Sequence, residues 1–125
     1  MSDGSGPAEE TPIYDASALA PFAAMQPELP AQLLATFTED LAATMPKLAR
    51  GIAEDDRQGV SEIVHRLKGA AGTVGARQLQ EAARQLLAAC RDPARPPLSA
   101  AWASFQGAWE RWQRFVDSSR TRAGG

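Results

Sequence analysis

The stretch Val64-His65-Arg66-Leu67-Lys68-Gly69-Ala70-Ala71-Gly72 lies near the middle of the chain, and the rest of the sequence is organised around it. It contains the only histidine among the 125 residues. Two glycines, Gly69 and Gly72, stand in what otherwise reads as one helix, and each costs about 1 kcal/mol relative to alanine in a helix interior. A helix that contains two destabilising glycines beside its only histidine indicates that the glycines have a functional role.

The apolar residues around this stretch recur with the spacing of a helix. They predict a helix over residues 58–74 with one face turned to a core. The members of that face are Val60, Ile63, Val64, Leu67, Ala70, Ala71 and Val74. On a helical wheel with Val60 at zero, this face spans roughly −80° to +40°.

The histidine and the two glycines share another stripe of the same wheel. His65 falls near ~140°, Gly72 near ~120° and Gly69 near ~180°, so all three point away from the core. Lys68, at about 80°, and Ser61, at about 100°, lie at the edge of the stripe. Positions without side chains leave a flat patch on which another protein can approach the ring closely. Gly69, Gly72 and Ser61 are therefore the candidate partner-docking residues.

Similar spacing predicts the remaining helices. Apolar residues recur every three or four positions over residues 30–54, 76–91 and 98–118. A shorter pattern over 16–25, which Asp15 can cap, predicts a short first helix. No segment alternates as a strand does. The sequence therefore predicts an all-α fold, an antiparallel up-down-up-down four-helix bundle with a short N-terminal helix that covers one end.

Several single residues refine this prediction. Pro46 falls inside the helix over 30–54 and is expected to kink it without ending it, because the apolar pattern continues in phase. Asp56 is a plausible cap for the helix over 58–74, and Gly75 can end it. Cys90 is expected to be a small buried residue. The aromatic stripe of the last helix is also predicted to be core: Trp102, Phe105, Trp109 and Trp112.

The length suits a single domain. Residues 1–12 are small, polar and rich in turn formers, and are expected to be disordered. The helical domain is predicted to span residues 13–118, followed by a disordered polar tail over 119–125.

Composition excludes several classes of function. The net charge of −2 and the absence of a basic run argue against a nucleic-acid-binding protein. No apolar stretch approaches the roughly 18 residues of a membrane span, and the first ten residues lack a signal pattern, so a cytoplasmic chain without membrane contact is expected. One cysteine and one histidine exclude an internal disulfide, a cysteine-based zinc site and a multi-histidine metal site. No cofactor is expected.

An exposed imidazole beside an ammonium group and an open surface favours phosphoryl transfer. A neutral imidazole is a competent nucleophile near pH 7, and Lys68 can attract phosphate as a point charge. Hydrolysis would normally require a pocket and a partner that orients the base, and a convex helical face supplies neither. Reversible transfer to and from another protein fits this surface better.

The residues from His65 to Gly75 resemble the H-x-L-K-G motif of histidine-containing phosphotransfer (HPt) domains, and the resemblance covers roughly residues 28–118. It implies a helical bundle whose histidine, here His65, accepts a phosphoryl group from a receiver-domain aspartate and passes it to an aspartate of a response regulator. Lys68 would help to hold the phosphoryl group, and Gly69 would keep the approach open. The magnesium required for transfer would belong to the receiver partner. Whether Arg77 or Gln78 reaches the phosphate stays open.

Three further interpretations compete with this one. The first is the dimerisation region of a histidine kinase, which has an acidic residue after its histidine and a proline five positions beyond it, where this chain has Arg66 and Ala70. A kinase also needs an ATP-binding domain whose motif uses asparagine, and the chain has no asparagine. An autokinase is therefore not expected, and we expect a monomer. The second interpretation is a structural or adaptor bundle in which His65 is incidental, and the third is a hydrolase that uses His65 as a base.

Overall fold

The structure is a computed structural model that describes residues 11–124, with side chains as far as residue 119. Its elements are the 3-10 turn η1 and five α-helices, and there is no strand within the described range. Their bounds are η1 Ala16–Ala18, α2 Ala20–Met25, α3 Leu29–Ala53, α4 Arg57–Val74, α5 Arg77–Arg91 and α6 Ser99–Gly124.

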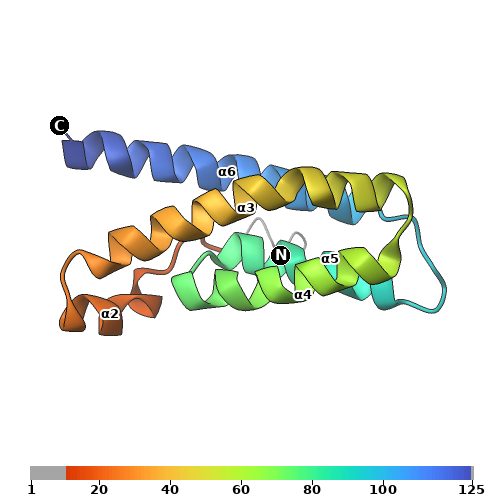
Figure 1. Cartoon of the computed structure of the whole chain (residues 1–125), viewed down its shortest axis with the longest axis horizontal. Coiled ribbons are helices and arrows are strands. Elements are labelled where there is room, and N and C mark those ends of the chain that lie inside the picture. The colour runs from red at the N-terminus through yellow and green to blue at the C-terminus, as the bar shows by residue number, and fades with distance from the viewer. Residues whose placement is uncertain (1–10, 125) are drawn as a thin grey trace, which may run out of the picture.

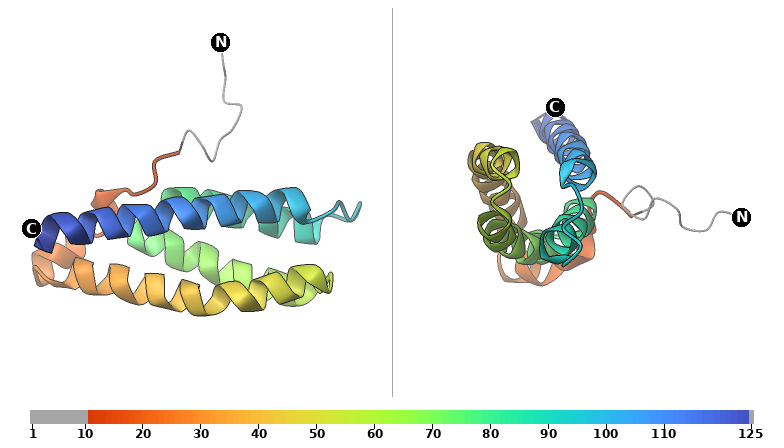
Figure 2. Two further views of the ribbon diagram at one scale, coloured as in Figure 1. Left: turned by 90° about the horizontal axis from the view of Figure 1, so that it is seen from above. Right: turned by 90° about the vertical axis from the view of Figure 1, so that its right-hand side faces the viewer.

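The helices α3 to α6 run alternately up and down and form the bundle (Figure 1). Seen from the end, each of them lies beside the next one along the chain, and together they surround the core (Figure 2). The short helix α2 lies across the end of the bundle at which α6 terminates (Figure 1). The predicted all-α bundle with a short covering helix is confirmed.

The C-terminal end of the bundle differs from the prediction. Helix α6 continues to Gly124, so the expected boundary at residue 118 and the disordered tail are wrong as far as residue 124. The apolar stripe stops near Val116, but no proline follows it, and arginine and alanine are good helix formers. An exposed final turn needs no contact with the core.

The N-terminal side of the domain begins earlier than expected. Residues 1–10 of the segment predicted to be disordered lie outside the described residues, but the Thr11 carbonyl accepts a hydrogen bond of 2.8 Å from Gln78 Nε2. The Arg77 amide donates to the Ile13 carbonyl (3.2 Å), and the Asp15 amide donates to the Gly75 carbonyl (2.8 Å). Residues 11–15, here called the N-terminal strap, are thus bound along the turn between α4 and α5.

The ends of α4 follow the expected chemistry. The Asp56 side chain accepts a hydrogen bond from the Gly59 amide at 3.0 Å, which caps the first turn. Gly75 ends the helix with a left-handed φ of 83°, and the Ala76 amide donates back to the Ala71 carbonyl at 2.9 Å. A Cβ at Gly75 would also collide with the Asp15 carbonyl oxygen, so both the backbone conformation and the strap require glycine.

The core consists largely of the predicted apolar faces. Trp112, Phe105 and Val64 are almost fully buried, and Cys90 and Trp109 are buried as expected. Trp112 Nε1 satisfies its hydrogen bond at Thr38 Oγ1 (3.0 Å), which connects α6 to α3. Ala70, which the wheel assigns to the core face of α4, is exposed because it stands at the margin of that face. Helix α3 continues through Pro46 without a break.

Candidate functional site

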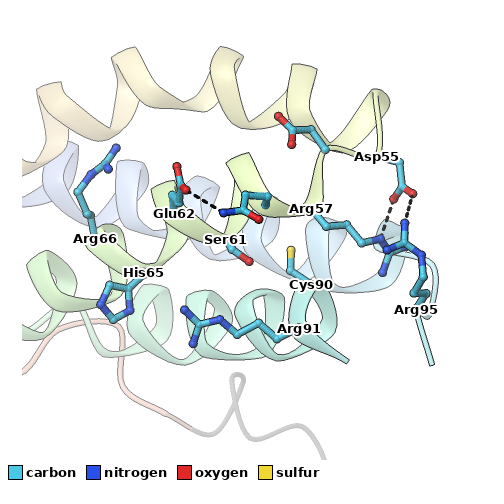
Figure 3. Close-up of a pocket in the computed structure, with 11 residues that line it drawn as sticks. Asp55, Arg57, Ser61, Glu62, His65, Arg66, Cys90, Arg91 and Arg95 are labelled. Atoms are coloured by element: carbon cyan, nitrogen blue, oxygen red, sulfur yellow. Dashed lines mark hydrogen bonds and ion pairs between the residues drawn. The ribbon is translucent and has the colours of Figure 1, made fainter. Parts of the chain in front are cut away.

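His65 lies on the outer face of α4, and its neighbour Val64 is buried in the core. Its ring is exposed and forms no hydrogen bond or ion pair within the described residues. The imidazole stands at a hollow of about 810 Å³ between α4 and the end of α5 (Figure 3). We call this hollow the His65 groove and define it by Arg57, Ser61, His65, Cys90, Arg91 and Arg95.

Ion pairs fix the far end of the groove. Asp55 Oδ1 accepts from Arg57 Nε at 2.8 Å, and Asp55 Oδ2 pairs with Arg95 Nη2 at 3.0 Å. The hydrogen bond from Arg57 is the main cause that lowers the pKa of the Asp55 carboxyl, and the charges of both arginines act in the same direction. Asp55 therefore joins the loop after α3 to the loop before α6, and it already balances charge on Arg57 and Arg95.

Two small side chains, Cys90 and Ser61, also line the groove. Cys90 is buried, and burial raises the pKa of its thiol, although a hydrogen bond with the Ser61 side chain opposes this effect. Ser61, a predicted docking residue, is half-buried in the groove one helical turn before His65. It contributes to the wall beside the ring, and its role in docking stays a prediction.

Lys68 follows His65 on α4. It is half-buried and lines a second hollow, of about 280 Å³, between α4, α5 and the N-terminal strap. Within the described residues Lys68 has no hydrogen bond or ion pair, so its ammonium group is available to an incoming anion. His65 and Arg91 line the first hollow, and Lys68, one helical turn after His65, lines the second.

The two glycines of the predicted bare stripe lie in different surroundings. Gly69 is exposed, and a Cβ built on it would meet nothing within 4 Å, so the surface beside His65 is open at this position. Gly72 is half-buried, and a Cβ there would lie 2.7 Å from Gln80 Nε2. The prediction that Gly72 belongs to the bare stripe is therefore wrong. The wheel describes one helix alone and does not include the side chain that α5 lays over Gly72.

Arg77 and Gln78 are both engaged within the domain. Arg77 pairs with Asp15 at 3.3 Å and donates to Gln80 Oε1 at 3.0 Å. Gln78 is buried, donates to the Thr11 carbonyl and accepts from Arg111 Nε at 2.7 Å. These bonds hold the N-terminal strap against α5 and α6, so both side chains already have structural partners.

Arg91 is a residue of the site that the sequence patterns do not identify. It belongs to the last turn of α5, far from His65 along the chain, and only the packing of α5 against α4 brings both residues to one groove. The one signal in the sequence is a basic residue at a helix C-terminus, which is ordinarily explained by the helix dipole.

Membrane spans and metal clusters are both absent from the part of the chain that the structure describes. None of its helices is long and apolar enough to span a bilayer. No three His, Cys, Asp or Glu side chains of residues 11–124 are grouped so that they could hold a metal ion.

Comparison with known proteins identifies the family. The sequence pattern of the Hpt domain matches residues 32–121. The aerobic respiration control sensor protein ArcB of Escherichia coli (strain K12) is 31% identical over 96 residues, which cover 73% of this chain but only 11% of that protein.

Two solved structures share the fold. Histidine-containing phosphotransfer protein B of Pseudomonas aeruginosa PAO1 has a TM-score of 0.77 at 22% identity, with 89% of this chain and 96% of that one covered. A candidate histidine-containing phosphotransfer protein from rice has a TM-score of 0.72 at 19% identity, with 84% and 79% covered. With the matched sequence pattern, the bundle and the exposed histidine on α4, the chain belongs to the Hpt domain family of histidine phosphotransfer modules.

Proposed function

We propose that His65 is the phosphoacceptor of this module, which takes a phosphoryl group from a receiver-domain aspartate and passes it to an aspartate of a response regulator. The observation that carries the proposal is the position of the ring. The only histidine of the chain is exposed on α4, without an intramolecular hydrogen bond in the described residues, at the histidine of the H-x-L-K-G pattern. An acceptor that two different proteins must reach needs such an open position.

The transfer step requires little from the module itself. The lone pair of one ring nitrogen attacks the phosphorus atom of the aspartyl phosphate, and a nitrogen–phosphorus bond forms. The bond from phosphorus to the carboxyl oxygen breaks, and its electron pair remains on the aspartate as carboxylate. The other ring nitrogen keeps its proton. Onward transfer reverses these events with a second aspartate, so no net oxidation or hydrolysis occurs.

Lys68 and Gly69 have supporting roles in this proposal. The Lys68 ammonium group, which has no partner among the described residues, lies one turn from His65 and attracts the phosphoryl oxygens. Gly69 leaves room for the partner's backbone. The magnesium ion is held by the receiver's own carboxylates, so the module needs no cofactor of its own. The chain contains no asparagine for the ATP-binding motif of a kinase, so the module has no autokinase activity. It acts as a monomer in the cytoplasm, where receiver domains are its partners.

The experiment follows the phosphoryl group directly. A phosphorylated receiver domain is mixed with the chain, and acid-labile, alkali-stable label is measured on the wild type and on His65→Gln. Label is expected on the wild type only. Because His65 is exposed and bonds to none of the described residues, the variant is expected to keep its circular dichroism spectrum and unfolding midpoint. Equal label on the two proteins would contradict the proposal and favour a bundle in which His65 is incidental.

Sedimentation distinguishes the proposed module from a histidine-kinase dimerisation region. Such a region forms a stable dimer, whereas the proposed module sediments as a monomer.

A further inference from the structure

Arg91 places a positive charge beside His65 that nothing in the described part of the chain neutralises. It lines the His65 groove, is exposed, and forms no hydrogen bond or ion pair within residues 11–124. Two other arginines of the groove, Arg57 and Arg95, share the carboxylate of Asp55. Their charges are thus partly balanced before any ligand arrives, and that of Arg91 is not.

The antiparallel packing of α4 and α5 brings Arg91 within reach of the ring. Arg57 Nη1, in the first turn of α4, donates to the Ala89 carbonyl in the last turn of α5 at 3.4 Å, so the end of α5 lies level with the turns of α4 that precede His65. Ser61, His65 and Arg91 line the same hollow. One helical turn is about 5.4 Å, a distance that an extended arginine side chain covers. Helical side chains lean toward the N-terminus of their own helix, and in α5 that direction leads back toward the level of His65.

Figure 3 shows the result of this geometry: the Arg91 side chain extends along α5 toward His65. Arg66 also lines this hollow and has no ion pair among the described residues. It follows His65 directly in the sequence and points away from it toward α3 (Figure 3). Adjacent helical residues do not face each other, so Arg66 cannot serve the same oxygen atoms.

The remaining charged groups around the ring have other partners or lie in the second hollow. Glu62 accepts from Gln58 at 3.2 Å, and Arg84 pairs with Glu81 at 2.6 Å. The charged residues that line the same hollow as His65 are Asp55, Asp56, Arg57, Glu62, Arg66, Arg91 and Arg95. Lys68 follows His65 by one helical turn on α4, whereas Arg91 extends toward the ring from α5 (Figure 3).

We propose that Arg91 is a phosphoryl-binding residue, which donates hydrogen bonds from α5 to the phosphoryl oxygens carried by His65, while Lys68 approaches them from α4. This inference rests on the proposed function of His65. A planar guanidinium suits a phosphoryl group, because it can donate two parallel hydrogen bonds to it. The phosphoryl group would then be held between cations from two helices and would keep a defined orientation for the next receiver.

The competing explanation is that Arg91 only stabilises the C-terminus of α5 through the helix dipole. That role predicts a lower unfolding midpoint when the charge is removed, and no effect on a phosphoryl group. The test therefore measures a property of the phosphoryl group itself, namely the pH at which it loses its second proton.

His65 is phosphorylated with phosphoramidate, which needs no receiver, and the second ionisation of the phosphoryl group is followed by ³¹P NMR as a function of pH. A nearby cation favours the dianion, so the midpoint of Arg91→Gln is expected to lie above that of the wild type by about half a pH unit. Arg114→Gln removes the same charge from an exposed position on α6 and is expected to titrate as the wild type does. Arg91→Lys should restore most of the shift.

The outcome decides the assignment in either direction. A midpoint in Arg91→Gln equal to that of the wild type overturns it, as does an equal shift in Arg114→Gln, which would show a general effect of net charge. Failure of the proposed function is recognised separately, because it appears as absence of label from a phosphorylated receiver, whereas chemical phosphorylation of an exposed histidine does not depend on any partner.

Discussion

Gly69 and Gly75 both lie near the C-terminal end of α4, and a methyl group has opposite consequences at the two positions. Gly69 faces open space in an ordinary helical conformation, so Gly69→Ala is expected to raise the free energy of unfolding by up to about 1 kcal/mol. Gly75 has a φ of 83° and touches the strap, so Gly75→Ala is expected to lower it by more than about 1 kcal/mol. Urea denaturation measures both.

Substitutions at Gly69 and Gly75 also separate the effect on phosphoryl transfer from the effect on stability. Gly69→Leu should slow phosphoryl transfer from a receiver while the bundle stays folded, because the side chain stands on the surface beside His65. Gly75→Ala, far less stable, should transfer normally at temperatures where it is folded. A normal transfer rate in Gly69→Leu would show that the open position is not needed for docking.

One buried polar side chain, that of Gln78, connects the first residue of the N-terminal strap to helix α6. Gln78 bonds the Thr11 carbonyl and accepts from Arg111, so Gln78→Leu leaves a carbonyl and a guanidinium without their partner. A loss of about 1–3 kcal/mol in the free energy of unfolding is expected. Gln113→Leu, at an exposed position of α6, is the matched control and should change little. Equal unfolding midpoints for the two variants would show that the hydrogen bonds of Gln78 contribute nothing to stability.

The helices themselves are predictable because the period of apolar residues is a property of each segment alone. The exposure of His65 and the burial of Val64 follow from that period. The caps at Asp56 and Gly75 follow from the residue types at the two ends of α4. Each of these features depends only on residues within about one helical turn along the chain, so the local sequence is enough to predict it.

The errors concern contacts between helices. Gly72 is wrongly assigned to a bare surface because the wheel of α4 cannot show Gln80 of α5. Arg91 escapes prediction because its distance to His65 depends on the register of two antiparallel helices, which no local pattern encodes. The end of α6 is predicted too early for another reason: the loss of apolar residues marks the end of core contact, while the helix continues to Gly124.

At the scale of the whole molecule, the bundle presents one exposed histidine ring on its surface. Lys68 and Arg91, the cations beside this ring that lack partners among the described residues, come from α4 and α5, and residues 11–124 contain no group of side chains fit for a metal ion. If the metal ion of the reaction belongs to the receiver, removing it with EDTA should stop transfer to the receiver. The same treatment should leave the phosphorylated chain alone unaffected. The phosphorylated chain alone should hold its phosphoryl group equally long with and without EDTA.

Transfer from this phosphorylated chain to a receiver should stop in EDTA and resume when magnesium is restored. The measurement is the loss of label from His65 over time, first alone and then with a receiver, with a magnesium-free receiver buffer as the control. If EDTA changes the lifetime of the phosphohistidine in the absence of any receiver, a metal ion is bound to this chain. That result would contradict the proposal that only the receiver holds the metal ion.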